Sequence, residues 1–136
     1  MIKYSHPIKV YYRDVDKMNI VYYSRYFEYF EESRTELLAS VGLNIKNVEQ
    51  EGILLPVISS HCDYKKGAMF EDAILIKTWI NEMPRLTLKF FYKAVLKKTN
   101  DVLVKGYTIH AFVNNFNKPI KPPKKILSHM EKYFEN

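Results

Sequence analysis

The sequence contains little cysteine, glycine or proline, and it has no long apolar run. Its one cysteine, Cys62, cannot form an internal disulfide bond. With 4 glycines and 6 prolines among 136 residues there is no linker, so we expect a single domain spanning 1–136. No apolar run approaches the roughly 20 residues of a membrane-spanning helix, and the N-terminus lacks the apolar stretch of a signal peptide. These absences predict a soluble, cytoplasmic protein.

Metal-ligating residues are also sparse. The 4 histidines are scattered along the chain, and no two of them stand at the spacing of metal ligands. We therefore expect no metal site. The composition, with 47% hydrophobic and 26% charged residues, is typical of a globular domain and excludes a disordered chain.

Positive charge is concentrated in the second half of the chain. The formal net charge is +6, but residues 1–82 contain 10 Lys and Arg against 12 Asp and Glu, whereas residues 83–136 contain 11 against 3. Such a basic excess is typical of a protein with an anionic partner, either a nucleic acid or a small ligand with several phosphates. Solubility alone is the alternative explanation.

Hydrophobic periodicity predicts an α+β fold. Alternating residues indicate a first strand, and a wide aromatic stripe with a period of 3.6 residues then indicates a long helix that ends before Gly42. Four further strands with short connections predict an antiparallel meander, and a short amphipathic helix closes the chain. The predicted strands are 2–12, 53–64, 72–81, 85–96 and 102–114, and the predicted helices are 22–41 and 124–134. A sheet curled around the long helix would enclose its aromatic stripe, and the open sheet edges would favour pairing with a second copy.

Two carboxylates, Asp14 and Asp16, precede the long helix. A helix N-terminus presents unpaired N–H groups that can stabilise an oxyanion, and a nearby carboxylate can act as a base or a nucleophile. The structural alternative is that each Asp caps the helix or forms a turn. The residues alone leave both readings open.

The segment from Asp16 through Asn19, Ile20-Val21 and Tyr22-Tyr23 to Tyr26 resembles the signature of hotdog-fold acyl-CoA thioesterases of the 4-hydroxybenzoyl-CoA thioesterase family. The resemblance continues through Leu55-Pro56-Val57, residues 66–72 and the strand that ends with residues 110–114. It implies a hotdog fold, in which a five-stranded antiparallel sheet wraps a long central helix. It also implies hydrolysis of acyl-CoA thioesters, with coenzyme A as part of the substrate and no separate cofactor.

In this family the residue that matches Asp16 is the catalytic carboxylate, and the backbone N–H at the position of Tyr23 polarises the thioester carbonyl. The resemblance does not decide whether Asp16 attacks directly or activates water. Asn19 stands where relatives commonly have Gly, and Asn tolerates a left-handed turn. Asp14 is interpreted as loop surface or as a supporting partner. The expected substrate-binding residues are Asn19, Val21, Tyr22, Tyr26 and Arg85, with Lys65 and Lys66 as weaker candidates for the nucleotide end.

The expected partners are an acyl-CoA and further copies of the chain, as a homodimer or as a tetramer built from two dimers. Neither a nucleic acid nor a membrane is expected. A hotdog protein that only binds acyl thioesters, or that cleaves acyl carrier protein thioesters, is the main alternative. RNA binding is a remote one, suggested by 11 Tyr, 8 Phe and the basic second half. Most of these aromatic residues fall on predicted core faces, which argues against it.

Overall fold

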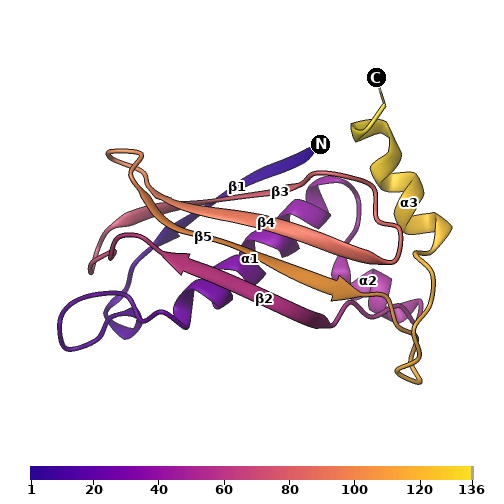
Figure 1. Cartoon of the computed structure of the whole chain (residues 1–136), viewed down its shortest axis with the longest axis horizontal. Coiled ribbons are helices and arrows are strands. Elements are labelled where there is room, and N and C mark those ends of the chain that lie inside the picture. Colours follow the sequence, from indigo (N-terminus) through magenta and orange to yellow (C-terminus); the bar gives the residue numbers. More distant parts are fainter. Residues whose placement is uncertain (136) are drawn as a thin grey trace.

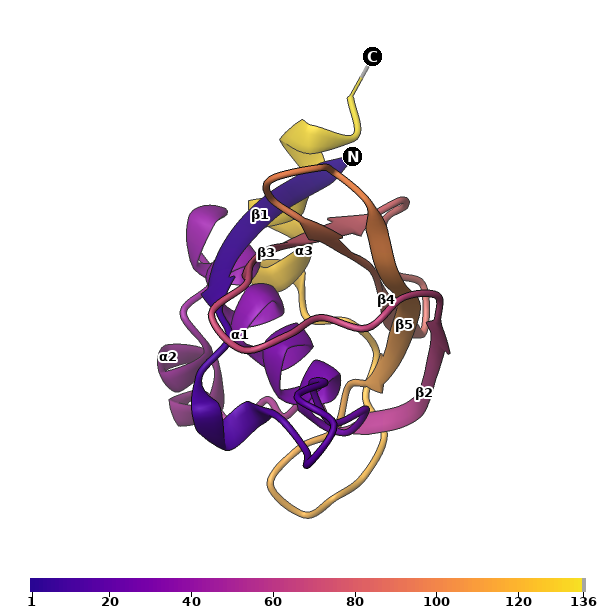
Figure 2. The same cartoon turned by 90° about the vertical axis from the view of Figure 1, so that its left-hand side faces the viewer.

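A five-stranded antiparallel sheet curls around one long helix in the computed structural model, which describes residues 1–135. Figure 2 shows the sheet curving around α1 from β1 at one edge to β2 at the other. The strands are β1 (Ile2–Lys9), β2 (Val57–Tyr64), β3 (Ala73–Ile80), β4 (Thr87–Leu96) and β5 (Val102–Ala111). The α-helices are α1 (Arg25–Ser40), α2 (Ile45–Gln50) and α3 (Lys124–Met130), and short 3-10 turns occupy Tyr12–Asp14 and Glu131–Tyr133. The hotdog architecture expected from the sequence is thereby confirmed.

The strand order is β1-β3-β4-β5-β2, so the predicted four-strand meander is wrong for one strand. Strands β3, β4 and β5 form the meander, but β2 pairs with β5 at the far edge. The connection 65–72 therefore crosses the end of the sheet instead of closing a hairpin. Three strand spacings of about 4.8 Å separate β2 from β3, a span that the eight residues of this connection can bridge.

The concave side of the sheet buries the aromatic stripe of α1. Phe30 is fully buried and stacks on Tyr92 of β4 at 4.2 Å between ring centroids. Gly106 of β5 lies opposite Tyr92, and a side chain there would meet the Phe30 ring. The helix and the sheet thus approach closely because one strand position carries no side chain.

The helix α1 begins at Arg25, three residues later than the periodicity predicted. The N–H groups of Val21 and Tyr22 donate to Ala68 O and Asp14 O, so these residues join neighbouring loops instead of starting the helix. No helix within residues 1–135 is long and apolar enough to cross a membrane.

Candidate active site

The loop before α1 folds back on itself and holds Asp16 at its bend. Val15 and Val21 form an isolated antiparallel bridge, and the Asp16 N–H donates to Ile20 O at 2.9 Å. Asn19 adopts φ 64°, the left-handed conformation that its sequence position predicted. A tight β-like turn therefore fixes the backbone on both sides of Asp16.

The Asp16 carboxylate is half-buried and only partly engaged. Its Oδ1 accepts the N–H groups of Met18 at 2.8 Å and Ile20 at 3.2 Å. Its Oδ2 accepts no hydrogen bond from any residue within 1–135. One oxygen thus orients the side chain, and the other is available to a ligand.

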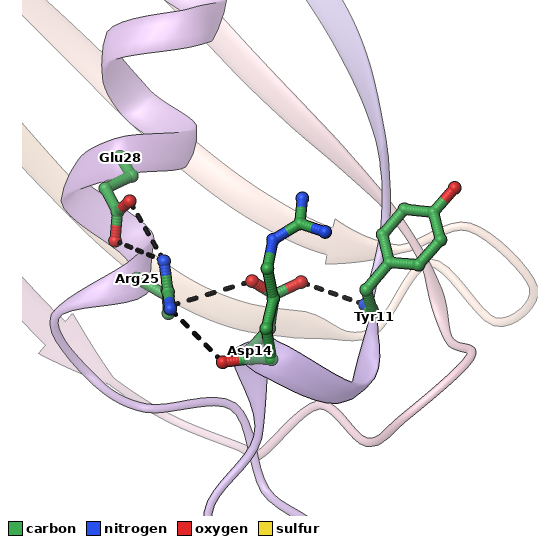
Figure 3. A network of polar contacts seen from close by, with 5 residues as sticks. Tyr11, Asp14, Arg25 and Glu28 are labelled. Atoms are coloured by element: carbon green, nitrogen blue, oxygen red, sulfur yellow. Dashed lines mark hydrogen bonds and ion pairs between the residues drawn. The ribbon is translucent and has the colours of Figure 1, made fainter.

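An ion pair between the buried Asp14 and the partly exposed Arg25 ties this loop to the start of α1 (Figure 3). Asp14 is 4% exposed, so its interpretation as loop surface is wrong, and its Oδ2 accepts the Tyr11 N–H at 2.9 Å. The Arg25 Nε lies 3.7 Å from Asp14 Oδ1, and the Arg25 guanidinium also donates to Glu28 and to Arg13 O. Arg25 is therefore occupied by the loop itself, which it clamps against the first turn of the helix.

Tyr23 lies at the beginning of this helix with its backbone fixed but its N–H unpaired. The Tyr64 hydroxyl of β2 donates to Tyr23 O at 3.1 Å, and the two rings meet edge to face. No residue in the described part of the chain accepts the Tyr23 N–H. The N–H stands one residue before the Ser24 N-cap position, where the helix dipole favours negative charge.

The other predicted substrate-binding residues near Asp16 differ in exposure. Tyr22 is 46% exposed and Asn19 is exposed, whereas Val21 and Tyr26 are buried in the single chain. Burial, with a further contribution from Cys62, raises the pKa of Tyr26 to about 12, so this phenol stays neutral. The two buried residues shape the floor under the loop, and only the exposed two can meet a ligand without rearrangement.

The three predicted basic residues lie at two ends of the sheet. Lys65 and Lys66 follow β2 at the end that carries Asp16, and Lys66 pairs with Asp101 at 2.9 Å. Arg85 precedes β4, and the start of β4 lies at the opposite end of the sheet from the end of β2. The path of the strands can be followed in Figure 1. One chain therefore does not bring Arg85 to Asp16.

Sequence reasoning missed a cavity of about 420 Å³ between α1, α2 and the segment 53–56 that precedes β2. Arg34, Phe90 and His110 are among the residues that line it. It lies at the Arg85 end of the sheet, away from Asp16 of the same chain. Its walls come from five separate segments, so no local motif could have indicated it.

A directed chain of hydrogen bonds leads from this cavity into the core. The His110 Nδ1 lies 2.9 Å from Leu55 O, which can only accept, so Nδ1 carries the proton. In the neutral ring the Nε2 then accepts a hydrogen bond from the Thr108 hydroxyl. The Thr108 oxygen in turn accepts from the Tyr92 hydroxyl, and the Tyr92 oxygen accepts from the Arg34 guanidinium at 3.4 Å. His110 is thus a hydrogen-bonded core residue.

This arrangement predicts a pH-dependent loss of stability. Burial lowers the pKa of His110 from 6.5 to about 4, so the unfolded chain binds a proton more readily than the folded one. The neutral ring therefore stabilises the fold above pH 6.5, and we expect about 3 kcal/mol to be lost as the pH falls to about 4. Urea unfolding across this range would measure it. His110→Gln should be less stable at neutral pH and show a shallower decline, and parallel curves for the two proteins would contradict the assignment.

Comparisons with known proteins agree with one another. A family model for the thioesterase-like superfamily matches residues 10–130. A putative esterase from Aquifex aeolicus is 31% identical over 119 residues, covering 88% of this chain and 91% of the relative. The acyl-CoA thioesterase YbgC from Haemophilus influenzae is 27% identical over 126 residues, covering 90% of each. The structure of a DHNA-CoA thioesterase from Staphylococcus aureus superposes with a TM-score of 0.89 at 26% identity, covering 98% of this chain and 90% of that one.

Proposed function

Because the chain belongs to the thioesterase-like superfamily, we propose that it is an enzyme that hydrolyses acyl-CoA thioesters to a free acid and coenzyme A. The observation that carries the proposal is the loop before α1. It combines a carboxylate that has one unengaged oxygen with an unpaired N–H at the start of a helix. Relatives named as acyl-CoA thioesterases support the substrate class.

In the proposed reaction Asp16 promotes attack on the carbonyl carbon of the thioester, either as a general base or as a nucleophile. As a general base, it takes a proton from water while the water oxygen attacks that carbon, and the C–S bond then breaks to release the coenzyme A thiolate. As a nucleophile, its own oxygen attacks, the same thiolate leaves, and water hydrolyses the anhydride. Both routes use the free Oδ2.

The Tyr23 N–H is proposed to polarise the thioester carbonyl. The negative charge that develops on the carbonyl oxygen would meet this donor and the positive end of the α1 dipole. The bond from the Tyr64 hydroxyl to Tyr23 O supports this role because it holds the same residue's backbone in place. A thioester is already electrophilic, so we expect this apparatus to work without a cofactor.

We propose further that the enzyme is a homodimer joined along β2, with two such dimers forming a tetramer as an extension. Edge strand β2 contains neither Lys nor Pro, and Val57 and Ile58 are 47% and 59% exposed. The other edge, β1, carries Pro7 between two lysines, which discourages strand pairing. Antiparallel pairing of two β2 strands about a two-fold axis sets the start of one strand beside the end of the other.

This dimer would explain how Arg85 and Asp16, which lie at opposite ends of the sheet in one chain, could contact the same substrate. The end of β2 lies beside Tyr23, and its start lies at the end of the sheet that holds Arg85 and the cavity near His110. Pairing would therefore bring Arg85 from one subunit to the end of the sheet that carries Asp16 in the other. The phosphates of coenzyme A are a suitable ligand for Arg85 and Lys65.

Ile58→Lys should disrupt this pairing because a charge at an edge strand opposes it. Light scattering should then report the 16.2 kDa monomer instead of its multiples, and hydrolysis should fall by about tenfold or more as the composite site is lost. Phe116→Lys is the matched control, since Phe116 is 82% exposed in the turn after β5. An active Ile58→Lys monomer would reject the shared site.

The reaction is tested by incubating the protein with short, long and aromatic acyl-CoAs and measuring free thiol with a thiol reagent. Release of thiol supports the proposal. Binding of an acyl-CoA without thiol release would identify a non-catalytic binder. If the protein hydrolysed only acyl carrier protein thioesters, the reaction would still be thioester hydrolysis, but the thiol carrier would be acyl carrier protein instead of coenzyme A.

A further inference from the structure

The convex side of the sheet, which faces the reader in Figure 1, concentrates positive charge. The strands contain six lysines, and every one of them points outward, away from α1. Asp63 is the only acidic residue in the strands, and none of the six lysines forms an ion pair within residues 1–135. We call this surface the outer sheet face. Its lysines are Lys3, Lys9, Lys77, Lys89, Lys93 and Lys105.

An aromatic row crosses the middle of the outer sheet face. Trp79, Phe91, Tyr107 and His61 are cross-strand neighbours on β3, β4, β5 and β2. The rings of Trp79 and Phe91 stack at 5.7 Å, and those of Tyr107 and His61 at 5.4 Å. Lys89 Nζ lies 4.8 Å and 4.2 Å from the ring centroids of Phe91 and Tyr107. Aromatic surface and positive charge are thus interleaved.

A lysine row runs directly beside the aromatic row. Lys77 lies opposite Lys93, and Lys93 lies opposite Lys105, on three adjacent strands. Like charges in directly opposite positions destabilise a sheet. Asp63 of β2 lies opposite Lys105 but forms its ion pair with His61, and no acid lies opposite Lys77 or Lys93. A bound polyanion would therefore relieve the repulsion between these lysines.

We propose that the outer sheet face binds single-stranded nucleic acid, with phosphates along the lysine row and bases against the aromatic row. An antiparallel sheet that is covered by helix on one side and presents aromatic and basic residues on the other is a recurrent platform for single strands. A second copy of this chain fits poorly because it would place its own lysines against these.

The proposal revises one step of the sequence argument. The core-face position expected for the aromatic residues holds for Phe90 and Tyr92 but not for Trp79, Phe91 and Tyr107, which face outward. The outer sheet face also lies across the sheet from α1, so the proposal does not depend on thioester hydrolysis.

Trp79 is the only tryptophan in the chain, so its fluorescence reports directly on the aromatic row. Titration of the 136-residue chain with a single-stranded oligouridylate of roughly 12 nucleotides should quench this fluorescence, with an affinity that falls steeply as salt is added. Heparin and polyglutamate are the comparison probes, because they supply negative charge without bases.

Two double variants with the same change in charge distinguish binding at the outer sheet face from general attraction to a basic protein. Lys77→Glu/Lys93→Glu should weaken oligouridylate binding by about tenfold or more. Lys97→Glu/Lys98→Glu, in the exposed turn after β4, should leave it nearly unchanged. Phe91→Leu keeps the strand and the charge and should weaken binding several-fold through lost stacking.

Three outcomes would overturn the proposal. The first is the absence of any oligouridylate binding. The second is equal weakening by both double variants, which would indicate general charge attraction. The third is binding of polyglutamate as tight as that of oligouridylate with no response to Phe91→Leu, which would identify the surface as a site for an acidic protein. Unchanged circular dichroism in each variant ensures that folding is not the cause.

Discussion

Replacing Asp16 by Asn should lower kcat for acyl-CoA hydrolysis by about 10²- to 10⁴-fold, the usual effect of removing a catalytic carboxylate. Asn keeps a carbonyl oxygen in the position of Oδ1, so the bonds from the Met18 and Ile20 N–H groups can persist. The turn should therefore survive, and only the proton-accepting or nucleophilic oxygen is removed. Steady-state assays with free-thiol detection would measure the change.

Asp63→Asn is the matched control. It removes the same charge from an exposed position on β2, where Asp63 contacts His61 and has no proposed catalytic role. It should retain hydrolysis. For Asp16→Asn the coenzyme A affinity and the thermal midpoint should stay close to those of the unmodified protein. Full activity in Asp16→Asn would reject the assigned role.

Gly106→Ala should lower the free energy of unfolding by about 3 kcal/mol, the upper part of the range for overpacked cores. A Cβ at this position would overlap the carbonyl oxygen of His61 on β2 and lie 3.2 Å from the Phe30 ring. The first of these groups is backbone and the second is locked by stacking on Tyr92, so neither can move aside cheaply. Chemical denaturation would give the value.

Gly67→Ala provides the comparison, because its new Cβ would meet only the Ile20 side chain, at 3.0 Å. A side-chain methyl can shift by a few tenths of an ångström, so a much smaller loss is expected. If both variants lost the same stability, the close approach at Gly106 would not be the reason for its glycine.

Local patterns predicted every strand and the long helix, because alternation and the 3.6-residue period report which face of an element is buried. They could not predict the neighbour of β2. Its connection to β3, residues 65–72, is short enough for a hairpin and yet crosses the sheet, and only the pairing of β2 with β5 reveals this. Strand alternation contains no information on partner choice.

The family was predictable because its signature lies in one continuous segment around Asp16, and the resemblance to thioesterases is confirmed by the superfamily match. The left-handed Asn19 was predictable for the same reason. The hydrogen-bond chain from Arg34 to His110 was not, since helix and strand residues meet there only after the sheet has curled. Nor could a linear pattern place Arg85 at the opposite end from Asp16.

The position of β2 also governs when the chain can fold during synthesis. Its partner, β5, ends at residue 111, and the partner of β1 begins at residue 73. The first 64 residues therefore leave the ribosome as two strands without partners and a helix without its sheet. Such long-range pairing slows folding and prolongs the exposure of apolar surface. Most of the chain must be made before the helix is enclosed, so nascent molecules depend on rapid late closure or on chaperones to avoid aggregation.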